Sequence, residues 1–314
     1  MPVREPSADQ VLVKVSANAV CRTDLHVVEG DLPPQRATVV PGHQIVGRIE
    51  ALGADVRDMV EGQRVGIPWL GSTCGRCVFC LSGNENICER PVFTGYHVDG
   101  GYAEYAVARS GFCFRIPDTY DDVQATPLLC AGLIGFRSLR RAEVRGLDGP
   151  GRLGLFGFGS SAQIVIQVAR RLGHEVYVYT RGRKGQELAL ELGAAWAGGG
   201  EELPPVTLDS VIIFAPVGEL VPIALRSVRK GGVVVCAGIH MTPIPQFEYE
   251  LLWEERELKS VANLTRQDGH DFLELVAKEI VHAEVEVFEL EQANEALRRL
   301  RSGELRGTAV LVPR

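Results

Sequence analysis

A cysteine, a threonine and a histidine lie close together at positions 21–26, and a second histidine follows at position 43. The thiolate of Cys21 and the imidazole of His43 are ligands that zinc binds readily. The Thr23 hydroxyl and the His26 imidazole, which come between them, are groups that can pass a proton. Single cysteines and histidines are more often buried core residues than ligands. The stretch therefore suggests a metal site with a proton path, without establishing one.

Four cysteines form a second candidate metal site, with gaps of two, two and seven residues. They are Cys74, Cys77, Cys80 and Cys88. The short gaps let successive sulfurs turn onto one ion while nearby backbone N–H groups donate to them. Four sulfurs fill a tetrahedral shell and leave no position for substrate, so we expect a structural zinc in the lobe 74–88. The alternatives are an iron–sulfur cluster, which usually places one ligand farther away, and unrelated free thiols.

A glycine-rich turn follows an apolar run at 152–156 and opens a helical pattern. The turn consists of Gly157, Phe158, Gly159, Ser160, Ser161 and Ala162. In a dinucleotide-binding turn, Gly157 would permit the sharp bend, Gly159 would let the backbone approach a pyrophosphate, and Ala162 would allow close packing of helix and strand. An ordinary turn between a strand and a helix is the alternative interpretation.

The residues that end the next strand bear on which dinucleotide binds. NAD enzymes usually have Asp or Glu here, to accept a hydrogen bond from the ribose 2′-hydroxyl. This chain instead has Tyr179, Thr180 and Arg181, followed by further cations at 183 and 184. Thr180 and the cations could hold a 2′-phosphate, which favours NADP(H). If the cations are only a solvated start to the next helix, NAD(H) is the alternative.

The periodicity of apolar residues assigns these motifs to two regions. Up to about residue 130, short strands bounded by glycine and proline are typical of an irregular β-rich domain. From residue 131, strands alternate with helices, which predicts a parallel sheet. Ala215 and Ala237 end two of its strands at the carboxyl edge, where a nicotinamide should lie. The expected strands are 11–15, 45–51, 64–67 and 102–107 in the first region and 152–156, 176–179, 210–215 and 233–237 in the second.

The tail returns to the first domain. It predicts helices at 271–279 and 291–301 and strands at 284–288 and 308–312. We therefore expect a discontinuous catalytic zinc domain, residues 1–130 and 265–314, interrupted by a dinucleotide-binding domain at 131–264. Helices of the inserted domain are expected at 160–172, 185–192 and 219–228.

The composition limits what kind of protein carries these motifs. A chain of 314 residues is long enough for two domains, and its apolar (46%) and charged (23%) fractions are those of an ordinary globular protein. The net charge of −7 disfavours nucleic acid and anionic membranes as partners. The sequence predicts neither a signal peptide nor a membrane span. We expect a cytoplasmic protein, whose reducing surroundings favour metal ligation over disulfides.

In combination these motifs resemble the zinc-containing medium-chain alcohol dehydrogenases over nearly the whole chain. The motifs are Cys21-x-Thr23-Asp24-x-His26, Pro41-Gly42-His43, Gly62-x-Arg64-Val65 and the four-cysteine lobe. The resemblance implies an α/β protein with a β-rich GroES-like catalytic domain and a Rossmann domain with a doubly wound parallel sheet. It also implies that Cys130 joins Cys21 and His43 around a catalytic zinc, although alone it would be interpreted as a small buried residue.

The resemblance also implies a proton relay. Thr23 would take the proton of the alcohol, and His26 would lie at the far end, reached through the cofactor ribose. Asp24 would hold the His43 ring. The alternatives are a helix cap for Thr23, a surface position for His26 and a helix N-terminal carboxylate for Asp24.

Three more positions match residues that the family uses. Arg306 resembles an arginine that contacts the pyrophosphate, and a surface ion pair is the alternative. Leu32 and Trp69 resemble residues that line the alcohol pocket. Trp69 would narrow that pocket, which favours small, unbranched or planar alcohols, unless it is simply a core residue.

Two features depart from the family. Gln44 follows the ligand histidine where the family often has Glu, so a role for that residue in ligand exchange is in doubt. The chain also begins almost at its first predicted strand, where the family generally has a further stretch. We therefore expect either a shortened start or a sheet with an exposed edge.

The combined prediction is a zinc-dependent alcohol dehydrogenase that transfers a hydride reversibly between a primary or small alcohol, or its aldehyde, and NAD(P). We expect two zinc ions per chain, and the resemblance implies a homodimer or homotetramer. A polyol or sugar dehydrogenase on the same scaffold is one alternative. A non-enzymatic, zinc-stabilised, nucleotide-binding redox sensor is another, and the presence of a second ligand set argues against it.

Overall fold

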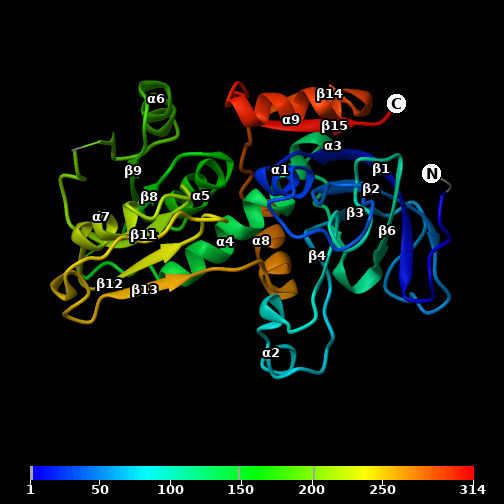
Figure 1. Ribbon diagram of the computed structural model, residues 1–314, viewed down its shortest axis with the longest axis horizontal. Coiled ribbons are helices and arrows are strands. Elements are labelled where there is room, and N and C mark those ends of the chain that lie inside the picture. The colour runs from blue at the N-terminus through cyan, green and yellow to red at the C-terminus, as the bar shows by residue number, and fades with distance from the viewer. Residues whose placement is uncertain (1–2, 148, 201) are drawn as a thin grey trace. The chain divides into compact units, whose positions relative to one another are not determined.

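The computed structural model describes residues 3–147, 149–200 and 202–314. It divides into unit 1, Met1–Leu133 with Asn263–Arg314, and unit 2, Ile134–Ala262 (Figure 1). Residues 1 and 2 of the expected first domain, and 148 and 201 of the expected second, lie outside the described residues. Among the described residues, no helix combines the length and apolarity that a membrane span requires.

Unit 1 is built on a seven-stranded sheet in the order β14-β15-β1-β2-β3-β7, with β6 also paired to β1. The first strand, β1, pairs with β2, β6 and β15, all antiparallel, so it lies inside the sheet and is not one of its edges. Alternate β1 residues face a core that also contains Ile45 and Ile49. The strands are β1 (Gln10–Ala19), β2 (Ile45–Leu52), β3 (Arg64–Ile67), β6 (Tyr105–Arg109), β7 (Phe114–Arg115), β14 (Val285–Glu289) and β15 (Thr308–Val312).

Capping residues set where two helices of unit 1 begin. Helix α1 begins after Cys21, and α8 begins after Thr265, five residues before the predicted start at 271. In both, the cap side chain accepts from a backbone N–H while an aspartate three residues on accepts from the cap's own N–H, which is a capping box. The helices of this unit are α1 (Arg22–Glu29), α2 (Val78–Leu81), α3 (Asp122–Ala125), α8 (Arg266–Lys278) and α9 (Ala293–Ser302), with 3-10 turns η1 (Glu85–Ile87), η2 (Ser110–Phe112), η3 (Thr126–Leu129) and η5 (Leu290–Gln292).

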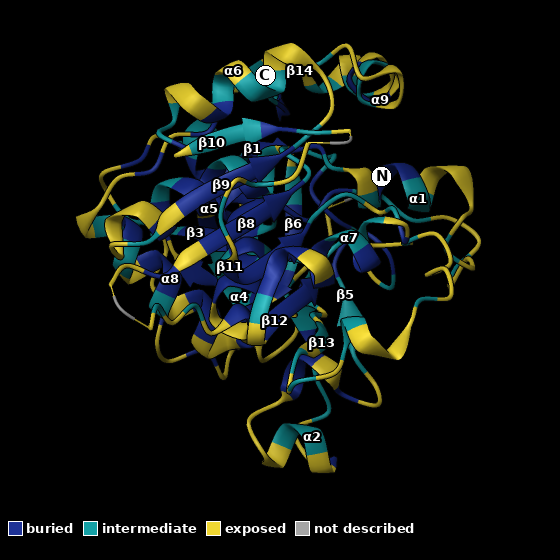
Figure 2. Cartoon of the chain, turned by 90° about the vertical axis from the view of Figure 1, so that its left-hand side faces the viewer, coloured by how far each residue is buried: buried dark blue, intermediate teal, exposed yellow. Residues whose placement is uncertain are grey.

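The four-cysteine segment forms a lobe of unit 1. It follows β4 (Leu70–Ser72), contains α2 and η1, and ends before β5 (Val92–Phe93), which pairs with β4. Figure 2 shows that α2 has exposed and half-buried residues and that none of its four residues is buried. Its attachment to the unit includes Glu85, whose carboxylate accepts hydrogen bonds of 2.7–3.1 Å from the Arg266 side chain at the start of α8.

Unit 2 is a six-stranded parallel sheet in the order β10-β9-β8-β11-β12-β13. Counted from β8, this is the 3-2-1-4-5-6 order of a Rossmann fold. The predicted doubly wound sheet is therefore confirmed, and β10 and β13 are additions that the periodicity did not reveal. The elements are β8 (Arg152–Phe156), β9 (Glu175–Tyr179), β10 (Trp196–Gly198), β11 (Leu208–Ile213), β12 (Val228–Cys236) and β13 (Glu257–Ser260), with α5 (Ser160–Arg171), α6 (Arg183–Glu191), α7 (Leu220–Ser227) and η4 (Tyr249–Leu251); α4 (Ala131–Ala142) spans the unit boundary.

The central strands of unit 2 are nearly continuous apolar runs. All six residues of β11 are buried, as are the last four of β8 and of β9 (Figure 2). Parallel strands with helices on both faces have no solvated side, which removes the alternation seen in β1. This explains why short unbroken runs predicted these strands correctly.

Candidate metal centre and dinucleotide site

The pairing of β1 with β2 brings two of the predicted zinc ligands together. Asn18 lies opposite Ile45 in the ladder, so the chain beyond β1, which carries Cys21, lies beside the chain before β2, which carries His43. Cys130 follows η3 and completes the set. The three ligand atoms all lie within 4.8 Å of one another, and Cys21 Sγ is 3.2 Å from His43 Nε2.

This donor set fits zinc. A tetrahedral ion with Zn–S and Zn–N bonds of about 2.3 and 2.0 Å would separate the sulfur and nitrogen by about 3.5 Å, close to the separation of Cys21 and His43. Three protein ligands would leave the fourth position of the shell to a small molecule, which is the arrangement of catalytic zinc sites.

Asp24 holds the His43 ring and caps α1 at the same time. Its Oδ1 lies 3.0 Å from His43 Nδ1 and accepts from the N–H of Gly42, while Oδ2 accepts from the N–H of Cys21 at 2.8 Å. Because a carboxylate only accepts, the ring proton lies on Nδ1 and Nε2 is left facing Cys21. Asp24 therefore has both roles considered from the sequence: it contacts the His43 ring, and it is a carboxylate at the N-terminus of a helix.

Proton sharing inside the ligand set favours an anionic sulfur. A hydrogen bond from the Cys130 thiol lowers the pKa of Cys21 well below its ordinary value in spite of burial, and His43 lowers it further. The same hydrogen bond, together with burial, raises the pKa of Cys130. Burial opposes a charged His43, but Asp24 and Cys21 outweigh it and raise the pKa of that ring. Zinc would replace the protons that this cluster otherwise holds.

The four lobe cysteines also have the geometry of one coordination shell. Their sulfurs lie within 4.8 Å of one another, with separations of 3.6 Å for Cys77 and Cys80, 3.9 Å for Cys77 and Cys88, and 4.0 Å for Cys74 and Cys80. A tetrahedral Zn²⁺ with four Zn–S bonds of about 2.3 Å would give sulfur separations of about 3.8 Å. The lobe therefore fits a closed zinc site.

Backbone donors prepare the lobe for a cation. The N–H groups of Arg76 and Cys77 lower the pKa of Cys74 to about 6. The N–H groups of Glu89 and Cys80 lower the pKa of Cys77, as the short gaps between the cysteines predicted. These donors favour the thiolate form, which is the form that binds a metal ion.

The glycine-rich turn has the geometry that its sequence predicted. Gly157 has a φ of 93°, and a Cβ there would lie 2.7 Å from the N atom of Ala215, so both the backbone conformation and the space require glycine. Gly159 is the N-cap of α5 and no side chain caps that helix. The backbone N–H groups of its first turn are therefore suited to an anion such as a pyrophosphate.

The turn lies at the switch point of the sheet, between β8 and β11. Phe156 ends β8 and accepts hydrogen bonds from the N–H groups of Phe214 and Ala215, just beyond β11. At the end of β9, Gln186 donates to the Thr180 carbonyl, and Arg181 is exposed. Doubly wound sheets bind nucleotides at such switch points, at the carboxyl ends of the strands.

Comparison with known proteins agrees with this geometry. A family model described as the alcohol dehydrogenase GroES-like domain matches residues 7–118. A probable alcohol dehydrogenase, AdhA, of Mycobacterium tuberculosis is 46% identical over 99% of this chain and 90% of its own length. The chain belongs to the zinc-containing medium-chain alcohol dehydrogenases.

Relatives and solved structures in this family extend the comparison. An alcohol dehydrogenase of Geobacillus stearothermophilus is 34% identical over 96% of this chain and 91% of its own. A cinnamyl alcohol dehydrogenase from Sorghum bicolor superposes with a TM-score of 0.89 at 26% identity, covering 99% of this chain and 92% of its own. An acetophenone reductase from Geotrichum candidum, solved with NAD, gives 0.88 at 26% identity with the same coverage.

The predicted relay residues of this alcohol dehydrogenase lie on α1. Thr23 is the second residue of the helix, and its N–H donates to Cys21 Sγ at 3.3 Å, so the cap is Cys21 and the interpretation of Thr23 as a cap is wrong. The His26 side chain is 14% exposed and therefore largely covered, so it is not a freely exposed histidine. The pattern Cys-x-x-Asp is a capping box with sulfur as its acceptor, and it was the signal that could have predicted α1.

Trp69 lies against the ligand histidine. The two ring centroids are 4.9 Å apart at an angle of 75°, and the indole stacks on Phe93 at 4.9 Å and on Tyr96 at 5.9 Å. Leu32 is half-buried in the segment after α1. Trp69 is thus held rigidly at the edge of the candidate metal site, consistent with a pocket wall.

Gln44 is buried behind the ligand histidine. Its side-chain amide donates to the carbonyl of Ala19 at 3.3 Å, and its backbone N–H donates to Asn18 at 3.4 Å. Among the described residues, its Oε1 has no hydrogen-bond partner. A neutral amide in this position adds no charge to the ligand set.

Arg306 lies in unit 1, in the turn before β15. Its side chain is exposed, and its backbone N–H donates to Glu286 at 2.6 Å. A contact with the cofactor pyrophosphate stays a prediction.

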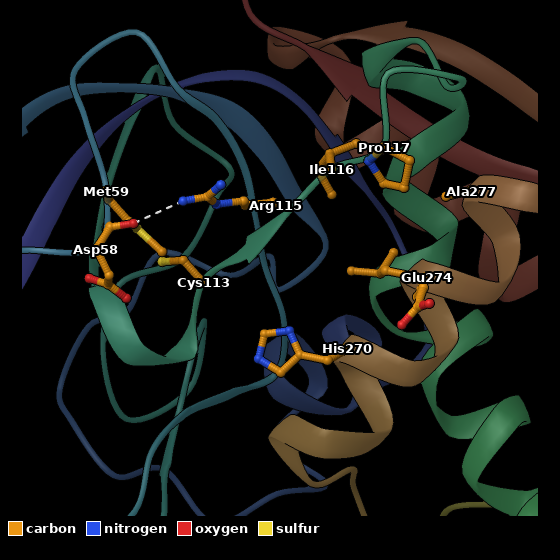
Figure 3. A pocket seen from close by; sticks show the side chains of 10 residues that line it. Asp58, Met59, Cys113, Arg115, Ile116, Pro117, His270, Glu274 and Ala277 are labelled. Atoms are coloured by element: carbon orange, nitrogen blue, oxygen red, sulfur yellow. Dashed lines mark hydrogen bonds between the residues drawn. The ribbon is translucent and has the colours of Figure 1, made fainter.

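The cavity shown in Figure 3 belongs to a different part of unit 1. It measures about 410 Å³, and none of its lining residues is a predicted ligand, relay or cofactor residue. Arg115 donates across it to the backbone carbonyl of Asp58 at 3.1 Å, and His270 and Glu274 reach it from α8. The candidate site is therefore assigned from the two ligand sets, which lie outside this cavity.

Proposed function

We propose that this protein is a zinc-dependent alcohol dehydrogenase that interconverts small or primary alcohols and their aldehydes with NADP(H). The observation that carries the proposal is the pair of ligand sets. One set has three ligands, so a tetrahedral ion there would have a fourth position for substrate, and the other set has four ligands and would be closed. An open and a closed site have different uses, since only the first can bind substrate.

Each residue of the open site has a role in the proposal. Cys21, His43 and Cys130 would hold the metal, and Asp24 would fix the His43 ring. Bound zinc would polarise the alcohol oxygen as a Lewis acid, and bound nicotinamide cofactor would accept the hydride. Thr23 would orient the alcohol and pass on its proton at Oγ1.

The proposed preference for small or unbranched alcohols rests on Trp69, which lies beside the candidate metal site. Trp69 is fixed by its stacked neighbours Phe93 and Tyr96, so it cannot swing away to admit bulk. We expect unbranched and planar alcohols to be accepted and branched secondary alcohols to react more slowly.

The proposed preference for NADP(H) over NAD(H) rests on the residues that follow β9. The carboxylate that would bind the 2′-hydroxyl of NAD is replaced by Thr180 and Arg181. The acetophenone reductase was solved with NAD, whereas a Sinorhizobium meliloti protein described as a zinc-binding dehydrogenase was solved with NADP at 26% identity and a TM-score of 0.89. These two structures were solved with different cofactors, and Thr180 and Arg181 of this chain support the proposal of NADP(H).

The test combines metal analysis with a substrate panel. We expect about two zinc ions per chain and oxidation of ethanol to medium-length primary alcohols, faster with NADP⁺ than with NAD⁺. Replacing Arg181 by Asp should reverse the cofactor preference and leave the zinc content unchanged. One zinc per chain, with no turnover of any alcohol under either cofactor, would overturn the proposal. Assembly as a homodimer or homotetramer is a further proposal, which light scattering would test.

A further inference from the structure

A carboxylate lies against the predicted relay histidine. Asp31 Oδ2 is 2.7 Å from His26 Nδ1. The side chain of Asp31 is 50% exposed, whereas that of His26 is 14% exposed. We infer that Asp31 is a positioning residue that keeps the ring proton of His26 on Nδ1 and so leaves Nε2 ready to take up a proton. The inference rests on the proposed function, because it concerns the path by which the alcohol proton leaves.

The end of α1 creates this contact. Gly30 ends the helix with a φ of 80°, and the N–H of Leu32 then donates to the His26 carbonyl at 3.2 Å. This reversal returns Asp31 to the helix, opposite a side chain five residues earlier. A Cβ on Gly30 would meet no atom within 4 Å, so glycine is required there by the backbone conformation alone.

The carboxylate fixes the tautomer of the ring. An ionised carboxylate can accept a hydrogen bond but cannot donate one, so Nδ1 of His26 must carry the proton that Asp31 accepts. In a neutral imidazole the other nitrogen then holds a lone pair. That atom, Nε2, is buried. A base that receives a proton from inside the protein needs this tautomer, and the opposite tautomer would present an N–H instead.

The same carboxylate stabilises the ring after the proton arrives. During alcohol oxidation the proton leaves the hydroxyl oxygen and a new N–H bond forms at Nε2, which makes His26 an imidazolium. The negative charge of Asp31 lies against that cation. Because Asp31 is half-exposed, the pair borders water, and the imidazolium loses one proton to solvent to become neutral again. One proton leaves the alcohol and one enters solvent, so the step is balanced.

The experiment compares Asp31→Asn with Asp31→Glu, and with Asp55→Asn as a matched control on an exposed aspartate of the same unit. The Asn variant keeps the size of the side chain but can donate to Nδ1, so the tautomer is no longer fixed. We expect kcat for alcohol oxidation to fall about 10–100-fold, with KM for the alcohol and the zinc content unchanged. A small amine base added to the buffer should restore part of the rate in D31N and leave the parent protein unaffected. D31E should recover part of kcat, and D55N should match the parent.

A second readout does not depend on activity. The ¹⁵N resonances of the His26 ring, assigned by their loss in His26→Gln, report which nitrogen carries the proton in the protein without cofactor. We expect the Nδ1–H form to dominate in the parent and in D55N, and a mixture of both forms in D31N. An unchanged tautomer in D31N would overturn the inference.

Failure of the inference is distinguishable from failure of the proposed function. If the parent oxidises alcohols and D31N keeps the parental kcat, only the positioning role is lost. If D31N loses zinc or raises KM and no base restores its rate, the contact is merely structural. If the parent oxidises no alcohol with either cofactor, the proposed function fails, and the relay role fails with it.

Discussion

The lobe cysteines reach one another through local turns, whereas Cys21, His43 and Cys130 meet because the sheet of unit 1 brings distant segments together. The lobe ligands span 15 residues, and Cys74 and Cys80 are half-buried, as are Cys21 and Cys130 of the open site. The ligand histidine of the open site is 1% exposed and lies 22 residues from Cys21. A ligand set made by local turns depends on its metal for order, whereas a set made by a sheet is ordered before the metal binds. Removal of one ligand should therefore affect mainly activity at the open site and mainly thermal stability at the lobe.

The largest expected effect is on activity, at the open site. Cys21→Ser keeps a good helix cap, since serine is a preferred N-cap residue, but removes a zinc ligand. We expect kcat/KM to fall by more than about 100-fold, beyond what losing a ligand's supporting residue typically costs, with one zinc retained and little change in Tm. Steady-state kinetics, metal analysis and thermal melting would check this. Cys21→Ala, which loses the cap as well, should also lower Tm. If C21S melted as low as C21A, the separation of the two roles would be wrong.

The lobe should show the reverse pattern. Cys77→Ser opens the closed shell, and structural zinc contributes directly to folding. We expect Tm to fall by roughly 5–10 °C, equivalent to a loss of a few kcal/mol in a domain of this size, with one zinc lost. Activity below the new Tm should fall far less than in C21S. Cys113→Ser, a buried cysteine outside both sets, is the control that should keep both zinc ions.

Asp24 should give an intermediate effect confined to the open site. Asp24→Asn removes the charge behind His43 but keeps an oxygen for the helix cap. We expect zinc affinity at this site to weaken about 10–100-fold, measured by competition with a chelator, while the lobe zinc exchanges at the parental rate. Equal weakening at both sites would contradict the independence of the two sets.

The smallest effect concerns the attachment of the lobe to α8. Burial opposes a charged Glu85, but hydrogen bonds from Arg266 outweigh it and hold the pKa of that carboxyl below its ordinary value. The ion pair therefore stabilises the fold above the unfolded pKa of about 4.5, and this stability is lost as the pH falls through the folded value.

Glu85→Gln should accordingly lower Tm at neutral pH by roughly 2–5 °C, for a loss of about 1 kcal/mol, and the difference from the parent should vanish in acid. Thermal melting between pH 3 and 8 would measure it. A difference that stays constant across this range would mean that the charge of Glu85 has no part in the attachment.

The spacing of the lobe cysteines alone predicted that their four sulfurs converge, whereas the grouping of Cys21, His43 and Cys130 was predicted only from the family resemblance, for a physical reason. Four cysteines with short gaps carry their geometry in their spacing. Cys130 lies 87 residues after His43, and no local pattern announces that the fold will bring them together. The Rossmann sheet was predicted because buried parallel strands are short apolar runs, and only β10 and β13, which are half-exposed, were missed.

The sequence also did not predict two side-chain contacts that depend on the tertiary structure or on a local chain reversal. Glu85 and Arg266 are 181 residues apart, and neither belongs to a motif. Asp31 was also missed, although it is close in sequence to His26, because its position depends on the reversal at Gly30. Helix α1 itself could have been predicted from its capping box and its terminal glycine. The capping box was overlooked because its cap residue is a cysteine, and Ser, Thr, Asp and Asn are the residues usually expected there.

The pairing of β1 with β15 has a consequence for the order in which the chain folds as it is synthesised. Asn18 and Leu311 lie opposite each other, so the sheet of unit 1 cannot close until the last residues emerge. Unit 2 is continuous from 134 to 262 and has no such delay. At about 5–20 residues per second, the remaining residues take roughly 3–10 seconds to make. During that interval we expect limited proteolysis of ribosome-stalled chains to cut before residue 134 and to spare unit 2; equal resistance of both parts would contradict it.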